Sequence, residues 1–204
     1  MNRQHSYNRR QGLKVVDGKT QRKNNWELTP NYLTVRPAKL LVEKLDPGRG
    51  YRHVVSRRDI LKFVEIIPDW NVLARGLRAI FLAHGDWNAA GYYCSAGVIE
   101  LCAWDDDPWR TWDARFYYEH AEVLARLNVP CEKDADGDFV CKFNDDTIRA
   151  WQLLHIFLHE LGHHHDRMNT RSKVRSAHGE KYAEAYALKQ EPLVWDRYRD
   201  VFDF

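Results

Sequence analysis

The feature that most restricts how this chain can fold is an apolar-faced helix that runs into a cluster of histidines. From Asp146 onward, apolar side chains recur three or four residues apart, which predicts one buried helical face. Asp146 could cap this helix, and the pattern continues into the stretch HELGHHHD at 159–166. The predicted face carries Ile148, Trp151, Leu154, His155 and Leu158. The rest of the chain must therefore pack other elements against this face.

The remaining periodicities mix helices with strands and predict an α+β fold. Alternating or continuous apolar runs predict strands, whereas apolar residues at helical spacing predict helices. The run DADGD at 134–138 resembles the start of a calcium loop, but Phe139 stands where such a loop needs glycine, so we expect a polar hairpin turn. Helices are expected at 59–67, 113–127 with Asp113 as N-cap, 146–163, 179–190 and from Pro192 onward, a further helical turn at 71–77, and strands at 78–84, 92–104 and 138–143.

Charge is distributed unevenly and divides the chain into two parts. Residues 1–25 carry seven Lys and Arg against one acid, Asp17, a net charge of +6, whereas the whole chain is only +2. This segment is also poor in apolar residues, so we expect 1–27 to be a disordered basic tail and 28–204 to form a single domain. The low net charge argues against a dedicated nucleic-acid binder, although the tail could associate weakly with nucleic acid or another acidic partner.

No secretory signal and no apolar run long enough to span a bilayer are visible, so we expect a cytoplasmic protein without a membrane partner. The four cysteines contain no C-x-x-C pair, which argues against a zinc ribbon. In a reducing compartment they are most simply small buried side chains, and a disulfide has no support in their spacing. These cysteines are Cys94, Cys102, Cys131 and Cys141.

The stretch HELGH at 159–163 has the spacing H-E-x-x-H, which suits a metal site on a helix. Residues four apart are neighbours on one helical face, so His159 and His163 can meet one zinc ion at roughly 2.1 Å each. Glu160 lies one step around the helix and can reach a water on the metal. Gly162 lowers helix propensity and could permit close packing. A polar helix end without a metal is the alternative reading.

A catalytic zinc site has three protein ligands and one open position, so a third ligand is needed. Asp166 lies close along the same helix, and His178 could fold back toward the pair. Glu180 and Glu184, four residues apart in GEKYAEAYA, are the better candidates. One could bind the metal while the other accepts a hydrogen bond from the far nitrogen of a ligating histidine.

HELGH followed by E-x-x-A-E-x-x-A resembles the gluzincin metallopeptidases. The matching residues lie within 59–190, the part of the chain that resembles a minimal zincin domain. The resemblance implies a small mixed or antiparallel sheet packed on the helix that bears HExxH, followed by a helix that bears a glutamate. It implies Glu180 as the third ligand and Glu184 as the carboxylate that holds a ligating histidine. The pair Glu184-Ala185 also permits the reverse assignment, because some members of the family have Glu-Ala at the ligand position. The chain departs from the family at Glu184, where Asp or Asn is usual. The match rests on His159, Glu160, His163, Glu180, Ala183, Glu184 and Ala187.

The resemblance also implies an activity, a zinc-dependent peptidase for peptide or protein substrates. Zinc would activate a water, and Glu160 would take its proton and pass it to the leaving amine. Two alternatives stay open: a regulatory or binding domain with a metal site but no peptidase activity, acting through protein or through nucleic acid bound by residues 1–25, and a hydrolase for other substrates.

Several further side chains keep open roles. Tyr182, Tyr186 and His178 are candidates for stabilising an oxyanion, or are simply packing and surface residues. His155 lies one turn before His159 and is either a core histidine or a residue that lines the site. The strand within 96–104 could present an open edge to an extended peptide. His84 and Tyr93 receive no role.

Overall fold

The described part of the chain is a mixed α+β structure centred on a four-stranded sheet. A computed structural model describes residues 14–16, 19–21, 40–94, 97–170 and 178–204. The sheet has the order β3-β5-β7-β6, in which β3, β5 and β7 are parallel and β6 is antiparallel to β7. This confirms the α+β prediction and its mixed sheet. The strands are β3 (Leu41–Lys44), β5 (Ala79–Ala83), β6 (Gly91–Cys94) and β7 (Val98–Cys102).

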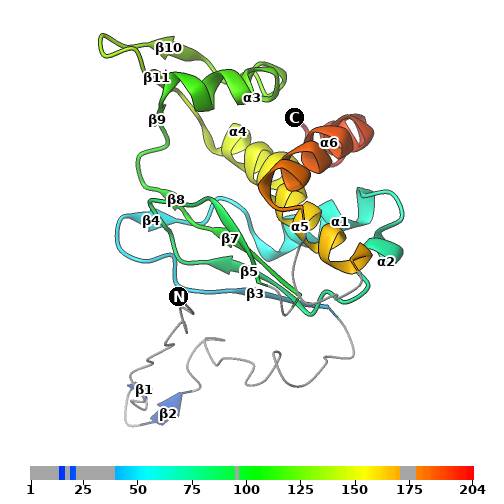
Figure 1. Ribbon diagram of the computed structural model, residues 1–204. Coiled ribbons are helices and arrows are strands. Elements are labelled where there is room, and N and C mark those ends of the chain that lie inside the picture. The colour runs from blue at the N-terminus through cyan, green and yellow to red at the C-terminus, as the bar shows by residue number, and fades with distance from the viewer. Residues whose placement is uncertain (1–13, 17–18, 22–39, 95–96, 171–177) are drawn as a thin grey trace. The chain divides into compact units, whose positions relative to one another are not determined.

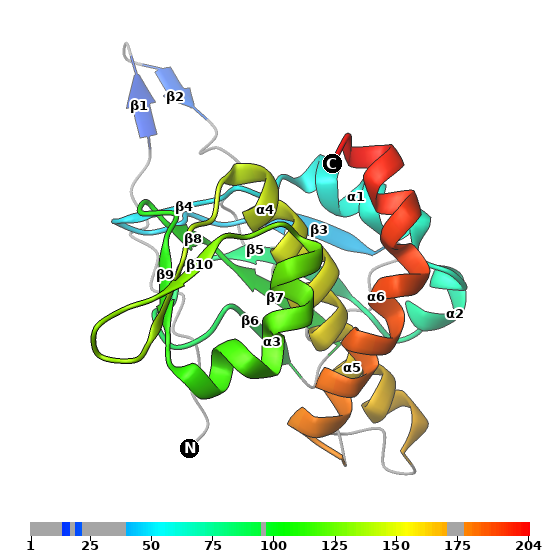
Figure 2. The ribbon, with the colours of Figure 1, turned by 90° about the horizontal axis from the view of Figure 1, so that it is seen from above.

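The helices lie on one side of this sheet (Figures 1 and 2), and some of them contact its strands directly. Three consecutive segments form one rod that carries the HELGHHHD stretch across β6 and β7, and the last helix packs along this rod. The rod consists of α4 (Asp145–Ala150), the π-helical segment η1 (Trp151–Phe157) and α5 (Leu158–Asn169). The other helices are α1 (Arg57–Ile66), α2 (Trp70–Leu73), α3 (Ala114–Arg126) and α6 (Glu180–Phe202).

Two smaller sheets lie in the same part of the chain as the four-stranded sheet, and a separate hairpin, β1–β2, is described below. A two-stranded sheet pairs β4 with β8, and a three-stranded sheet has the order β10-β11-β9. Their strands are β4 (Tyr51–Arg52), β8 (Trp104–Asp105), β9 (Arg110–Trp112), β10 (Cys131–Lys133) and β11 (Phe139–Cys141). No described helix is long and apolar enough to cross a membrane.

The chain separates into two compact units, residues 1–31 and 32–204. Within the segment expected to be disordered, β1 (Lys14–Val16) and β2 (Lys19–Gln21) pair as antiparallel strands. The rest of the tail expected at 1–27 lies outside the described residues. The expected association of this tail with acidic partners therefore stays a prediction.

The core lies between the rod and the sheet. Side chains of η1 and α5 that are almost fully buried meet those of α1 and the central strands. Phe157 packs edge-on against Phe63 of α1, which in turn meets Tyr198 of α6. Burial of these large side chains is the main stabilising contribution, about 1.5–3 kcal/mol each.

Helix starts follow local capping chemistry. Asp113 accepts a hydrogen bond from the Phe116 amide and caps α3, which confirms that prediction. Two other expected starts are wrong by a few residues: Ser56 caps α1 in a capping box with Asp59, and Asn144, not Asp146, caps α4. In both cases the side chain outside the apolar pattern satisfies the free amides of the first turn.

The expected break at Pro192 is wrong, because α6 continues through it. A proline inside a helix removes one hydrogen bond and costs about 3 kcal/mol. On either side of it, however, Glu191, Val194 and Tyr198 are fully buried. The packing of this continuous face outweighs the local cost.

The cysteine prediction is also corrected. Cys131 and Cys141 face each other in the register of β10 and β11 and form a disulfide. The turn between these strands is the expected polar hairpin, in which the Asp134 carboxylate accepts amide hydrogen bonds from residues 136–138. Cys102 is buried as expected, whereas Cys94 is exposed.

Candidate active site

The HELGH stretch presents two imidazoles on one face of α5. His159 and His163 lie one turn apart with ring centroids 5.0 Å from each other. The α-helix begins at Leu158, directly after the π-helical segment, so both histidines have the regular spacing of four residues. The geometry expected for the pair is therefore present.

Glu180 joins this pair from the first residue of α6. Its Oε2 lies 3.1 Å from the Nε2 of His159 and 3.4 Å from the Nε2 of His163. Ligand atoms about 2.1 Å from one tetrahedral ion are roughly 3.4 Å apart, so these three groups have the spacing that one zinc ion requires. The side chain of Glu180 is 82 % exposed, which leaves this group open on one side. We call His159, His163 and Glu180 the outer group.

Glu184 lies on the other side of the same imidazole. Its Oε2 is 3.1 Å from the Nδ1 of His159. A carboxylate accepts, so Nδ1 donates to Glu184. Nε2, which faces Glu180, is then the ring nitrogen that a metal would bind. This arrangement fixes the tautomer that a ligating histidine needs.

The two other candidates for a third ligand pair with each other. Asp166 is buried, its Oδ2 accepts a hydrogen bond from the backbone amide of His178, and its Oδ1 lies 2.6 Å from the Nδ1 of the same residue. Neither residue belongs to the outer group. The Asp166–His178 contact instead ties the segment before α6 to the middle of α5.

Close helix packing brings the glutamates to the histidines. A Cβ on Gly162 would lie 2.8 Å from the Cα of Ala183 and 3.0 Å from the Cβ of Tyr186. Only a glycine allows α5 and α6 to approach this closely, as the sequence suggested. Ala183 and Ala187 are fully buried in the same contact.

Glu160 lies on the sheet side of α5, against the edge strand. Its side chain is buried, and a Cβ on Gly91 of β6 would lie 3.0 Å from its Oε1. Burial raises the pKa of Glu160 to about 8, although nearby His159 acts in the opposite direction. A carboxyl group with a pKa near neutrality can both accept and release a proton.

The histidines respond differently to their surroundings. Burial lowers the pKa of His159, but the hydrogen bond to Glu184 and the charge of Glu160 outweigh it, so the pKa is raised overall. Burial is the main reason that the pKa of His163 is lowered. A lowered pKa keeps an imidazole neutral, which is the form that binds metals.

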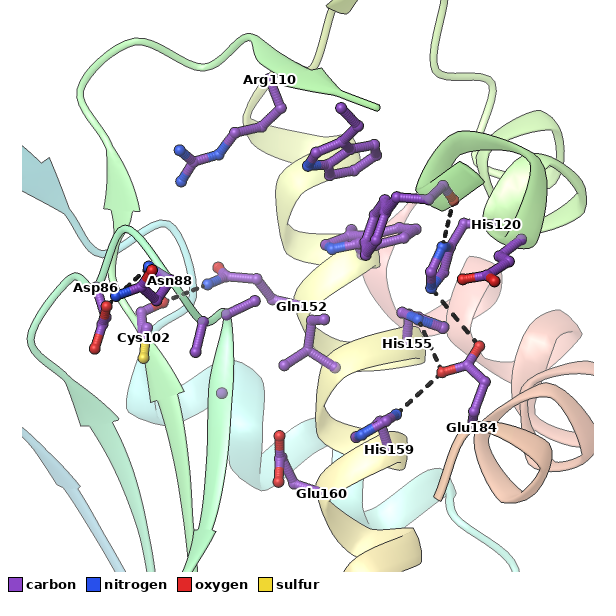
Figure 3. A pocket seen from close by; sticks show the side chains of 18 of the residues that line it. Asp86, Asn88, Cys102, Arg110, His120, Gln152, His155, His159, Glu160 and Glu184 are labelled. Carbon is purple, nitrogen blue, oxygen red and sulfur yellow. Dashed lines mark hydrogen bonds and ion pairs between the residues drawn. The ribbon is translucent and has the colours of Figure 1, made fainter. Parts of the chain in front are cut away.

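A cavity of about 870 Å³ opens beside these residues (Figure 3). His159 and Glu160 form one end, and the cavity continues along η1 past Gln152 to Arg110. The Gln152 amide donates to the Cys102 carbonyl at 2.8 Å, which ties η1 to the end of β7. The cavity is large enough for a chain of several residues or a small ligand.

The expected open edge belongs to a different strand. Strand β7, which carries most of the predicted edge segment, lies between β5 and β6. Within the described residues, β6 is the edge strand next to β7, and it contacts α5. The turn at Gly97 reverses the chain, so the predicted kink is real but puts β6 outside β7.

The residues with open roles are now placed. Tyr182 and Tyr186 lie against His165, and the Tyr182 hydroxyl is 2.8 Å from the Nδ1 of that histidine. The Tyr93 hydroxyl is 3.0 Å from the Nδ1 of His164 and accepts from Arg167. His84 is exposed at the end of β5 and is not part of the cavity lining.

Sequence reasoning missed His120 and Gly91. His120 of α3 lies with His155 and Glu184 in a second group of potential ligands. Nothing in its spacing marks it, because it is 35 residues before His155 and on another helix. The sequence placed Gly91 only in a turn-rich segment. Its contact with Glu160 comes from the packing of β6 against α5 and has no signal in the neighbouring residues.

Comparisons of the chain with known protein families, with curated proteins and with solved structures found no match.

Proposed function

We propose that the protein is a zinc-dependent hydrolase of the zincin type that cleaves peptide bonds. The observation that carries the proposal is the convergence of one carboxylate oxygen of Glu180 with the Nε2 atoms of His159 and His163, at 3.1 and 3.4 Å. The surrounding architecture supports it: a mixed sheet with an antiparallel edge strand lies on the HExxH helix, and a glutamate-bearing helix follows.

The outer group would hold the metal. Two imidazoles and one carboxylate form the donor set of many catalytic zinc sites, and the exposed side leaves a position for water or substrate. When bound, zinc lowers the pKa of a coordinated water from about 15.7 toward 7 and polarises a carbonyl oxygen.

Glu160 acts as the proton carrier in this proposal. It lies at the end of the cavity next to His159, where it can reach a water on the metal. It takes the proton of the attacking water and delivers it to the amine that leaves. Glu184 holds the His159 ring in place through Nδ1.

The edge strand β6 would align the substrate. Within the described residues no strand pairs with its outer side, so its backbone groups can bond to an extended peptide. Gly91 of this strand lets the Glu160 carboxylate lie directly against β6, because a Cβ there would be 3.0 Å from its Oε1.

The test compares wild type with Glu160→Gln on an unstructured protein such as casein. We expect the variant to retain zinc and to lose hydrolysis by at least about 100-fold, the usual contribution of a general base. Equal cleavage by both proteins would remove Glu160 from the mechanism. Zinc binding without cleavage by either protein would favour a regulatory or binding domain.

A further inference from the structure

A second group of potential ligands lies behind the first, deeper in the same cavity. His120 of α3, His155 of η1 and Glu184 of α6 each offer one donor atom, and these atoms lie within 4.8 Å of one another. Figure 3 shows both imidazoles directed at the Glu184 carboxylate. We call these residues the inner group.

The distances within the inner group are too long for hydrogen bonds. The Nε2 of His120 is 3.7 Å from Oε1 of Glu184, and the Nε2 of His155 is 3.7 Å from Oε2. Hydrogen bonds between nitrogen and oxygen are about 2.7–3.2 Å long. Around a zinc ion, by contrast, ligand atoms are separated by roughly 3.4 Å, close to the spacing seen here.

The protonation pattern points the same way. The Nδ1 of His120 lies 2.7 Å from the Phe116 carbonyl, which can only accept, so Nδ1 carries the proton. Nε2 is then the ring atom of His120 that faces the Glu184 carboxylate and is available to a metal. A cation placed between Nε2 and the carboxylate would be bound by both groups.

Burial of these three groups also favours a bound cation. His120 and His155 are more than nine-tenths buried, and the Oε1 of Glu184 has no hydrogen-bond partner among the described residues. A buried carboxylate oxygen without a partner is costly. A cation held by the three groups would satisfy it.

The ligands are also held in place before any ion arrives. The His120 ring stacks on Phe116 with centroids 4.0 Å apart, and the His155 ring lies against Trp151 at 4.5 Å. Both histidines line the cavity that contains His159 and Glu160, so an ion can reach them from there. Such preorganisation lowers the cost of binding.

We propose that His120, His155 and Glu184 form a second site for a divalent transition metal, with zinc as the ion that two imidazoles and one carboxylate favour. Glu184 links the two sites, because its Oε2 bonds to the Nδ1 of His159 while its Oε1 faces His120. This site does not depend on peptidase activity, and it goes beyond the proposed function.

Metal stoichiometry of the full chain tests the proposal. Zinc per chain is measured by elemental analysis after chelator treatment, reloading and dialysis. We expect two zinc ions in wild type, one in His120→Gln, one in His163→Ala and none in the double variant. His165→Ala is the matched control: it removes a histidine next to His163 that belongs to neither group, and should retain both ions.

Each outcome separates this site from the outer one. A single ion that is lost in His163→Ala but kept in His120→Gln overturns the inner site and leaves the outer one intact. A single ion with the reverse dependence supports the inner site and overturns the outer one. Wild type without zinc overturns both.

A second measurement on wild type guards against variants that fail to fold. Cobalt(II) is titrated into the metal-free chain while its visible absorption bands are recorded. We expect the bands to saturate at two equivalents. Saturation at one equivalent, together with one zinc ion that His120→Gln retains, contradicts the proposal.

Discussion

The outer and inner groups have the same donors, two imidazoles and one carboxylate, but very different surroundings. The outer glutamate, Glu180, is 82 % exposed and the inner one, Glu184, is 31 % exposed. The outer histidines are 18 % and 11 % exposed, and the inner ones 8 % and 3 %. A ligand set that is open on one side can admit water and substrate. A set enclosed by Phe116 and Trp151 is better suited to hold its ion and to keep Glu184 in place.

The largest expected effect distinguishes the two glutamates. Glu180→Ala should weaken zinc binding to the outer group by more than 100-fold, because it removes a ligand. Glu184→Ala should weaken it by about 10–100-fold, the usual effect of losing the partner of a ligating histidine. Both are measured with a competing chelator in the His120→Gln background, so that only the outer group is counted.

Lys189→Ala, an exposed change on the same helix, is the control and should leave affinity unchanged. If Glu184→Ala costs more than Glu180→Ala, the assignment of ligand and partner is reversed.

The outer group was predictable from sequence to a degree that the inner group was not. His159 and His163 lie on one helix, so a spacing of four places them together, and Glu180 followed from a likeness to a known arrangement. His120, His155 and Glu184 lie on α3, η1 and α6. No local pattern brings these elements together; only the packing of the whole domain does.

The same division holds for the fold. Amphipathic helices such as 113–127 and the apolar strand at 78–84 follow from periodicity, because each buries one face or both. The π-helical segment, the passage of α6 through Pro192 and the Cys131–Cys141 pair depend on tertiary packing or on strand register. These could not be deduced from neighbouring residues.

A buried contact between the helices that carry the inner group gives a pH-dependent prediction. The Nη1 of Arg126 in α3 lies 2.8 Å from the Oε1 of Glu191 in α6, a contact that joins the helices bearing His120 and Glu184. Burial nevertheless raises the pKa of Glu191 from 4.5 to about 7, with Arg126 acting in the opposite direction. The folded chain therefore keeps a proton that the unfolded chain releases.

Stability from this proton is complete below pH about 4.5 and is lost as the pH rises toward 7, by up to about 3 kcal/mol. We expect Glu191→Gln to remove this slope in chemical unfolding at several pH values. Asp196→Asn, an exposed carboxylate on the same helix, is the control. Parallel pH curves for Glu191→Gln and wild type would refute the assignment.

The positions of the outer-group residues depend on the close contact of α5 with α6. Gly162→Ala should lower the free energy of unfolding by roughly 1–2 kcal/mol, because overpacking against Ala183 outweighs the gain in helix propensity. It should also weaken zinc binding, since Glu180 and Glu184 move with α6. Thermal unfolding and chelator competition measure the two effects.

Ala185→Gly on the exposed face of α6 serves as the comparison. It should cost about 1 kcal/mol in helix propensity without changing zinc affinity. A Gly162→Ala protein with unchanged stability and affinity would show that the helices have room to spare.

The central claim is that His159, His163 and Glu180 together hold one metal ion. Anomalous diffraction at the zinc absorption edge, from crystals of the zinc-loaded full chain, tests it most directly. The account predicts a peak roughly 2.1 Å from the Nε2 atoms of both histidines and from a carboxylate oxygen of Glu180. A zinc-loaded crystal with no anomalous peak in contact with these three residues would contradict it.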